Sequence, residues 1–156
     1  MNSQPHLLGK FEKSPGFFCA ITLRRVAGGD TLVSFRGFPM VTERNRHSIQ
    51  IDANHHIVTR EASRFEVDDF LNHCCSPNAF LDTSTLDVLA LRDIEPGEEI
   101  CLNYCATEED LAEPFKCKCG SSDCYGLIRG FRFLSRSRQE ALRDVVSPWL
   151  KSKYGL

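Results

Sequence analysis

Three cysteines lie close together in a short polar stretch in the C-terminal third of the chain. Cys117, Cys119 and Cys124 form a C-x-C-x4-C pattern in FKCKCGSSDCYG, where charged residues alternate with the thiols. Gly120 and the serines that follow it permit a tight turn that directs the three sulfur atoms toward one point. Because structural zinc binds four ligands in a tetrahedron, the pattern predicts a zinc site that needs one further ligand.

The fourth ligand has to come from another part of the chain. The candidates are a histidine or one of Cys74, Cys75, Cys101 and Cys105. A free cysteine often packs as a small apolar group instead, and we expect this for Cys19 and Cys101, which lie in apolar runs. Cys105 directly follows such a run and is left unassigned.

Composition predicts one folded domain inside the cell. The 156 residues are 42% hydrophobic and 26% charged, as in globular domains, and include eight cysteines. No leader suggests secretion, so we expect a reducing location, cytoplasmic or nuclear, where clustered thiols bind metal instead of forming disulfides. No apolar run approaches about 18 residues, so no membrane span is expected. A formal charge of −2 argues against general nucleic-acid binding.

Short apolar runs separated by turn residues predict a mostly β domain. Residues 1–16 are polar and are expected to be loosely ordered. The runs 17–23 and 31–35 are expected to pair as a hairpin across the turn at 27–30. Further strands are expected at 47–52, 87–94 and 100–104.

Only the C-terminal end of the chain has a helical pattern. Ser135 or Ser137 is suited to cap a helix that continues to about Val146, with apolar residues on one face. The helix is expected to stop before Pro148. The predicted fold class is therefore mainly β with a C-terminal helix.

Three motifs occur in an order that resembles one enzyme family. They are NHCCSPN (72–78), GEEICLNY (97–104) and CKCGSSDC (117–124), and RDIEPGEE (92–99) leads into the second of them. They are similar to N-H-S-C-x-P-N, G-E-E-L-x-x-D-Y and C-x-C-x4-C of SET-domain protein lysine methyltransferases with a post-SET zinc motif. The resemblance implies a SET-domain (β-clip) fold of small sheets with a pseudoknot. It also implies a SET domain at 1–112, a post-SET zinc segment at 113–130 and a C-terminal helical extension at 131–156.

The resemblance assigns roles in binding the methyl donor, S-adenosylmethionine. Tyr104 would be the catalytic residue, with its hydroxyl near the transferred methyl group. Asn72 and His73 would bind the donor, and Phe115 would pack on its adenine, although a plain core role for Phe115 is equally open. Gly16, in SPGFFCA, stands where the family has a donor-binding motif with two glycines.

The resemblance also supplies the missing zinc ligand. Cys75 aligns with the family cysteine that joins the post-SET three. One structural Zn²⁺ per chain would then be bound by Cys75, Cys117, Cys119 and Cys124.

The expected function is S-adenosylmethionine-dependent methylation of lysine side chains in a protein or peptide, for example a histone-like protein. Three departures support an alternative: Asn103 replaces the usual Asp, Leu102 stands where Phe or Tyr is usual, and SPGFFCA offers only Gly16 where the family has two glycines. The alternative is a SET-like fold without lysine methylation, either a zinc-stabilised binding module or a pocket reused on a small molecule. A thiol redox protein is disfavoured because C-x-C-x4-C is a poor exchange motif beside C-x-x-C.

Two features bear on the partner. Residues 38–46 take the place of the insertion that usually builds one wall of the peptide groove, and they are few, so the groove is open or is completed by a partner or a second copy. The acidic stretch 93–113 contains no Lys or Arg. We expect it to attract a lysine-rich peptide, although any single acid in it is more often just solvated surface.

Overall fold

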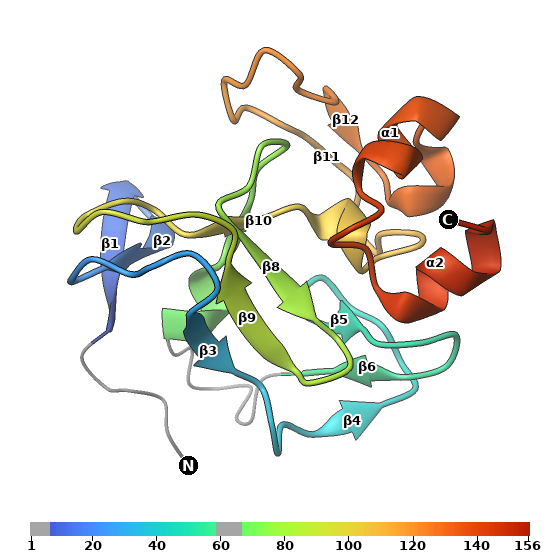
Figure 1. Cartoon of the computed structure of the whole chain (residues 1–156), viewed down its shortest axis with the longest axis horizontal. Coiled ribbons are helices and arrows are strands. Elements are labelled where there is room, and N and C mark those ends of the chain that lie inside the picture. Colours follow the sequence, from blue (N-terminus) through green and yellow to red (C-terminus); the bar gives the residue numbers. More distant parts are fainter. Residues whose placement is uncertain (1–6, 59–66) are drawn as a thin grey trace.

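The structure is a computed structural model that describes residues 7–58 and 67–156. In this part of the chain the strands form five small sheets, and the β3–β9–β8 sheet lies between the β1–β2 hairpin and the C-terminal helices (Figure 1). The pairs are β1 (Leu8–Ser14) with β2 (Phe17–Thr22), β3 (Thr31–Ser34) and β8 (Ala79–Asp82) with β9 (Asp87–Ala90), β4 (Met40–Val41) and β5 (Ile49–Gln50) with β6 (His56–Ile57), β7 (Asn72–His73) with β10 (Cys101–Leu102), and β11 (Phe115–Lys116) with β12 (Leu127–Ile128).

The β1–β2 hairpin corrects two expectations about the N-terminal part of the chain. Leu8–Ser14 is a regular strand, so the prediction of loose order was wrong for these residues, while residues 1–6 lie outside the described part. β2 pairs with β1, not with β3. Gly16, with φ +76°, lies in the turn of this hairpin in a conformation that glycine adopts without strain.

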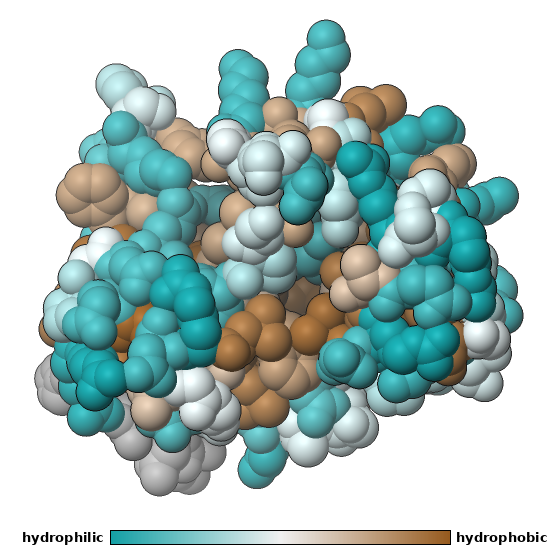
Figure 2. Space-filling view, turned by 45° about the horizontal axis from the view of Figure 1, so that its top comes forward, coloured by the Kyte–Doolittle hydropathy of each residue, from teal (hydrophilic) through white to brown (hydrophobic). Residues whose placement is uncertain are grey.

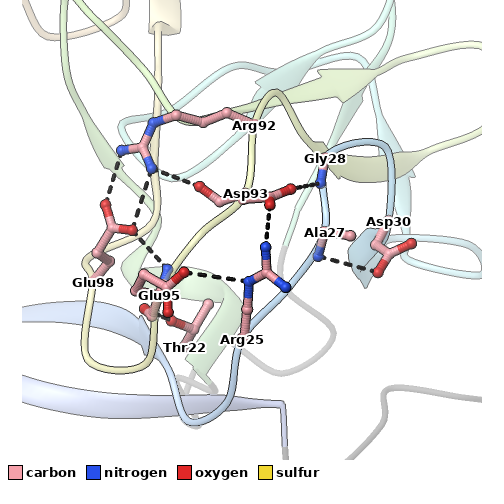
Figure 3. Close-up of polar contacts among 9 residues, drawn as sticks. All are labelled: Thr22, Arg25, Ala27, Gly28, Asp30, Arg92, Asp93, Glu95 and Glu98. Atoms are coloured by element: carbon pink, nitrogen blue, oxygen red, sulfur yellow. Dashed lines mark hydrogen bonds and ion pairs between the residues drawn. The ribbon is translucent and has the colours of Figure 1, made fainter.

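β3 pairs instead with β9, because the segment between β2 and β3 is bound to the end of β9 and to the residues that follow it. Val26 bridges Ile94, and the backbone N–H of Gly29 donates to the carbonyl oxygen of Ala90 at 2.8 Å. These contacts direct the 27–30 turn toward β9. Charged side chains reinforce the junction (Figure 3), through ion pairs of Arg25 with Asp93 and Glu95 and of Arg92 with Glu98.

The C-terminal end contains two α-helices where one was expected. α1 (Arg136–Ala141) is capped by Ser135 as predicted, but it ends before Val146. α2 (Pro148–Tyr154) begins at the proline that was expected only to stop a helix. Proline suits the first helical position, since its φ is fixed near the helical value and its missing N–H has no partner there. None of the helices in the described residues is long and apolar enough to cross a membrane.

Two clusters of buried apolar side chains form the core. One cluster gathers around the central sheet and includes Val88 and Ile100, and the other packs under the C-terminal helices and includes Phe131 and Leu150. Tyr104 packs against both clusters. It begins a short 3-10 helix, η2 (Tyr104–Ala106), while η1 (Val67–Phe70) and η3 (Phe131–Phe133) precede β7 and follow β12. Tyr104 therefore lies where the two parts of the core meet.

The strands β7 and β10 bring two distant motifs together. β7 is the start of NHCCSPN and β10 lies inside GEEICLNY, and they pair in parallel with Asn72 beside Cys101 and Leu102 beside His73. The backbone N–H of Cys74 extends the pairing by donating to the carbonyl oxygen of Leu102 at 2.8 Å. The parallel pairing of β7 and β10 is thus what builds a site from residues near 72 and residues near 104.

Candidate active site and zinc site

Four thiols meet at one point between the NHCCSPN loop and the segment from β11 to β12. The sulfur atoms of Cys75, Cys117, Cys119 and Cys124 all lie within 4.8 Å of one another. Cys75 Sγ is 3.8 Å from Cys117 Sγ and 4.0 Å from Cys124 Sγ. A tetrahedral zinc ion with Zn–S bonds of about 2.3 Å places its sulfurs about 3.8 Å apart. The donor set and the spacing therefore fit zinc.

The surroundings of Cys75 favour a thiolate once a metal is bound. Burial raises the pKa of the Cys75 thiol. The backbone N–H of Tyr125 points at Cys75 Sγ at 3.2 Å, and His73 Nε2 lies 3.3 Å from the same sulfur. Two donors directed at one sulfur offset part of the negative charge of a metal-bound thiolate.

His73 connects this sulfur to Tyr104. Burial lowers the pKa of His73 to about 4, so the ring is neutral. Its Nδ1 accepts a hydrogen bond from the backbone N–H of Tyr104 at 3.1 Å. The remaining ring proton is therefore on Nε2, which faces Cys75. The ring links the thiol cluster to the backbone of the tyrosine expected to be catalytic.

Tyr104 is a hydrogen-bond donor whose side chain is only partly exposed. Burial, and then the nearby negative charge of Glu108, raise the pKa of Tyr104 to about 12, so the hydroxyl keeps its proton near neutral pH. That hydroxyl donates to the carbonyl oxygen of Leu71 at 2.8 Å. The rings of His73 and Phe115 lie edge-on at centroid distances of 5.3 and 6.1 Å. The side chain is fixed from three sides.

An open cavity of about 620 Å³ lies against these residues. It is lined by Gly16, Asn72, Tyr104 and Phe115. His73 does not line it, but its ring accepts a hydrogen bond from the backbone of Tyr104. The volume is in the range of small-molecule and cofactor sites, about 300–1,000 Å³. Figure 2 shows apolar surface gathered in a hollow near the middle of one face, with hydrophilic side chains on both sides. The structure thus brings together the residues that the motifs single out.

Asn72 positions one wall of the cavity. Its Nδ2 donates to the carbonyl oxygen of Phe18 in β2 at 2.9 Å and to Oε1 of Glu99 at 3.2 Å. Phe18 lines the same cavity. Asn72 therefore connects the β1–β2 hairpin, which contains Gly16, to the segment that leads into β10 and Tyr104.

Asn103 contacts two segments of the chain. Its Oδ1 accepts from the backbone N–H of Cys105 at 3.0 Å, which caps η2, and its Nδ2 donates to the hydroxyl of Tyr125 at 3.1 Å. A carboxylate would accept the first hydrogen bond, and it could take part in the second only by accepting from the Tyr125 hydroxyl. The side chain at position 103 therefore joins the tyrosine segment to the cysteine-rich segment.

Sequence reasoning missed Glu108 as a member of the site. Glu108 lines the cavity with Tyr104 and Leu102, and only 9% of its surface is exposed. The available signal was an acid four positions after Tyr104, followed by more acids. That signal does not distinguish a buried carboxylate from a solvated one.

Comparison with known proteins decides the family. The family described as SET domain matches residues 11–105, well over half of the 156 residues. The chain belongs to the SET domain family. This membership agrees with the predicted fold class, since both the small sheets and the C-terminal helical end are present.

The similar proteins are larger than this SET-domain chain. Methyltransferase flvH of Aspergillus flavus is 41% identical over 70 residues, which is 44% of this chain and 39% of that protein. A histone-lysine N-methyltransferase, H3 lysine-36 specific, of Aspergillus oryzae is 37% identical over 67 residues, 39% of this chain and 7% of that protein.

A solved structure shares the fold of this chain. KRYPTONITE in complex with mCHH DNA, H3(1–15) peptide and SAH matches with a TM-score of 0.59 and 20% identity, over 77% of this chain and 29% of that one. The chain thus spans well under half the length of these three proteins.

Proposed function

We propose that this SET domain is an S-adenosylmethionine-dependent methyltransferase that acts on lysine side chains of a protein or peptide. The observation that carries the proposal is the cavity in which Asn72, Tyr104 and Phe115 converge beside the four-cysteine cluster. The names of the histone-lysine methyltransferase relatives support the same activity. When bound, the donor supplies an electrophilic methyl group on a sulfonium.

The residues of this chain would do the rest. Gly16, Asn72, His73 and Phe115 are proposed to hold the donor, and a zinc ion on the four thiols would fix the cysteine-rich segment beside them. Tyr104 offers a hydroxyl that stays protonated and is held in place, which suits positioning of the reacting groups and not proton removal. The apolar part of the cavity disfavours an ammonium ion, and a neutral lysine amine is the form that reacts.

The substrate class follows from the relatives and from the cavity. Names that specify H3 lysine 36, and a fold neighbour solved with an H3(1–15) peptide, make histone H3 peptides the first substrates to test. We place the reaction inside the cell, where the free thiols stay reduced. A second copy or a partner protein is proposed to complete the peptide groove.

Calorimetric titration of the zinc-loaded protein with S-adenosylmethionine tests donor binding. We expect binding in the micromolar range. Absence of binding up to millimolar donor would reject the proposal. If the donor binds, peptide arrays with labelled donor identify the substrate.

Replacement of Tyr104 by Phe tests its role. The variant keeps the ring but loses the hydroxyl that donates to Leu71, so we expect turnover to fall at least tenfold. Steady-state methylation of the best array peptide measures this. Tyr154→Phe, which removes a tyrosine hydroxyl hydrogen-bonded to Glu109, is the matched control and should keep activity. Equal turnover in Tyr104→Phe and the wild type would show that the Tyr104 hydroxyl has no role in methyl transfer.

A second candidate is methylation of a small molecule in the same cavity. It is favoured by the 41% identical relative, which is named only as a methyltransferase. Donor binding together with no labelled peptide on a broad array would favour this candidate.

A further inference from the structure

The acidic stretch 93–113 is mostly neutralised within the molecule, so the expected attraction of a basic peptide by the whole stretch needs correction. Of its eight acids, all but Glu108 form ion pairs with lysine or arginine in the described part of the chain. The pairs are Asp93 and Glu95 with Arg25, Glu98 with Arg92, Glu99 with Lys13, Glu109 with Lys153, Asp110 with Arg44 and Arg132, and Glu113 with Arg46. Figure 3 shows three of these acids in one network.

Glu108 differs from its neighbours in both place and partners. Its Oε1 accepts from the backbone N–H of Gln50 at 2.7 Å and from the Thr107 hydroxyl at 3.4 Å. Within residues 7–58 and 67–156, no hydrogen bond reaches its Oε2, and that atom is not among the buried polar atoms without a partner. The free oxygen therefore has an accessible surface, and the residue lines the cavity.

The backbone places Glu108 next to the tyrosine. Its N–H donates to the carbonyl oxygen of Tyr104 at 2.9 Å, so the two residues are one turn apart. Both side chains line the cavity, together with Leu102. A cation in the part of the cavity near Tyr104 is therefore within the electrostatic reach of Glu108, whose charge also acts on Tyr104.

A buried carboxylate without a cation is costly, and such groups concentrate at functional sites. Burial raises the pKa of Glu108 to about 7, against the opposing effect of the hydrogen bond from Gln50. The carboxyl group therefore ionises at a higher pH than an ordinary glutamate does. It can accept a proton and release it again without a large energetic penalty.

We propose that Glu108 binds the ammonium group of the target lysine inside the cavity and accepts one of its protons before methyl transfer. In this step an N–H bond of the ammonium breaks and an O–H bond forms on the carboxylate, while the electron pair stays on nitrogen. That pair then forms the new N–C bond as the methyl–sulfur bond breaks. The proton leaves to water when the product departs. This role rests on the proposed function.

Several other charged groups face the same space and set its pH behaviour. Arg44 acts on Glu108 from the segment between β4 and β5, and favours the carboxylate. Arg46, His47, Asp69 and Glu113 line the cavity. Arg46 and Glu113 pair with each other at 3.9 Å, with 65% and 63% of their side chains exposed, so they are largely solvated.

A binding test does not depend on turnover. The probe is n-butylammonium, which has the chemistry of the end of a lysine side chain, and n-butanol is the uncharged control ligand. Calorimetry at pH 8 should give binding of n-butylammonium to the wild type that is at least tenfold tighter than to Glu108→Gln. Glu98→Gln, an equal change at an acid paired with Arg92, is the control variant and should bind like the wild type. Equal binding to wild type and Glu108→Gln, or no binding to the wild type, overturns the proposal.

A second measurement uses the unaltered protein in case Glu108→Gln does not fold. In a carbon-13 NMR titration of glutamate carboxyl groups, the signal that titrates near neutral pH should shift to a lower midpoint when n-butylammonium is added. A midpoint that does not move overturns the proposal.

Kinetics separate this proposal from the proposed function. With a peptide found by array, Glu108→Gln should lower kcat/KM at least tenfold and remove the acidic limb of its pH profile, while calorimetry shows unchanged donor binding. Wild-type kinetics in Glu108→Gln would reject the role of Glu108 and leave the methyltransferase in place. No donor binding in the wild type would reject the methyltransferase, and the n-butylammonium result would still decide whether Glu108 binds a cation.

Discussion

His73 and Asn103 show how single side chains couple the two parts of the core. His73 joins the backbone of Tyr104 to the sulfur of Cys75, and Asn103 joins the cap of η2 to the hydroxyl of Tyr125. Asn103 directly precedes Tyr104, and His73 lies in β7, the strand that pairs with β10. A change in the thiol cluster therefore reaches Tyr104 through two short hydrogen-bonded links.

Glu108 should make stability depend on pH. Its pKa rises from 4.5 to about 7 on folding, so the unfolded chain loses this proton at lower pH than the native protein does. The contribution of Glu108 to stability therefore falls as pH rises from about 4.5 to 7 and stays low above that. Glu108→Gln should be more stable than the wild type at pH 8 by about 3 kcal/mol, and the gain should vanish near pH 4.

Urea unfolding of wild type and Glu108→Gln at both pH values measures this difference. Glu98→Gln, at an exposed pair, serves as the reference and should show no such gain. An equal effect of Glu108→Gln at pH 4 and pH 8 would contradict a raised pKa.

At the scale of elements, the start of α2 is attached to η2, the short helix that begins with Tyr104. The backbone N–H of Ser147 donates to the carbonyl oxygen of Ala106 at the end of η2 at 2.8 Å, and the Ser147 hydroxyl oxygen accepts from the N–H of Leu150 at 3.3 Å. Ser147 is 1% exposed. The start of α2 is thus attached directly to the short helix that begins with Tyr104.

Ser147→Ala should destabilise the protein by about 1–2 kcal/mol, since it removes a helix cap in a buried place. Denaturant unfolding measures the loss. Ser135→Ala removes the corresponding cap of α1, where the hydrogen bond to Arg138 is exposed, and should cost less. Equal losses in the two variants would show that α2 is not held more firmly than α1.

Residue patterns predicted which residues lie together at the candidate site better than they predicted the strand pairing. The motif order located Asn72, Tyr104 and the four cysteines, because ligands and polar side chains of special type are visible in the sequence. The partner of β3 was not visible, since Val26 and Ile94 meet through tertiary contact alone. Two-residue strands such as β5 and β10 are shorter than the apolar runs that contain them, because hydrogen-bonded pairing ends sooner than the run does. The boundaries at residues 112 and 130 stay predictions.

At the scale of the whole molecule, the thiol cluster joins segments that are distant in sequence. Cys75 and Cys117 are 42 positions apart, and the second core cluster includes Cys75 together with residues of the C-terminal helices. A metal at this point would close a long loop, and its removal should loosen the wall that carries Phe115.

Zinc content and donor binding should therefore be linked. We expect about one zinc per chain by elemental analysis, with its loss in Cys75→Ser but not in Cys19→Ser. Cys19, 1% exposed in β2, is the matched control. Treatment with a strong chelator should weaken S-adenosylmethionine binding at least tenfold. Retention of zinc in Cys75→Ser would remove Cys75 from the site.

The cavity wall has a consequence for synthesis of the protein. Its lining comes from many separated stretches of the described residues, and the last of them to leave the ribosome contain Tyr104, Phe115 and Val145. β3 likewise waits for β9, which is more than 50 positions further along. Long-range pairing of this kind is slow to form. A growing chain therefore exposes its first hairpin and its free thiols before the segments that complete the cavity have formed.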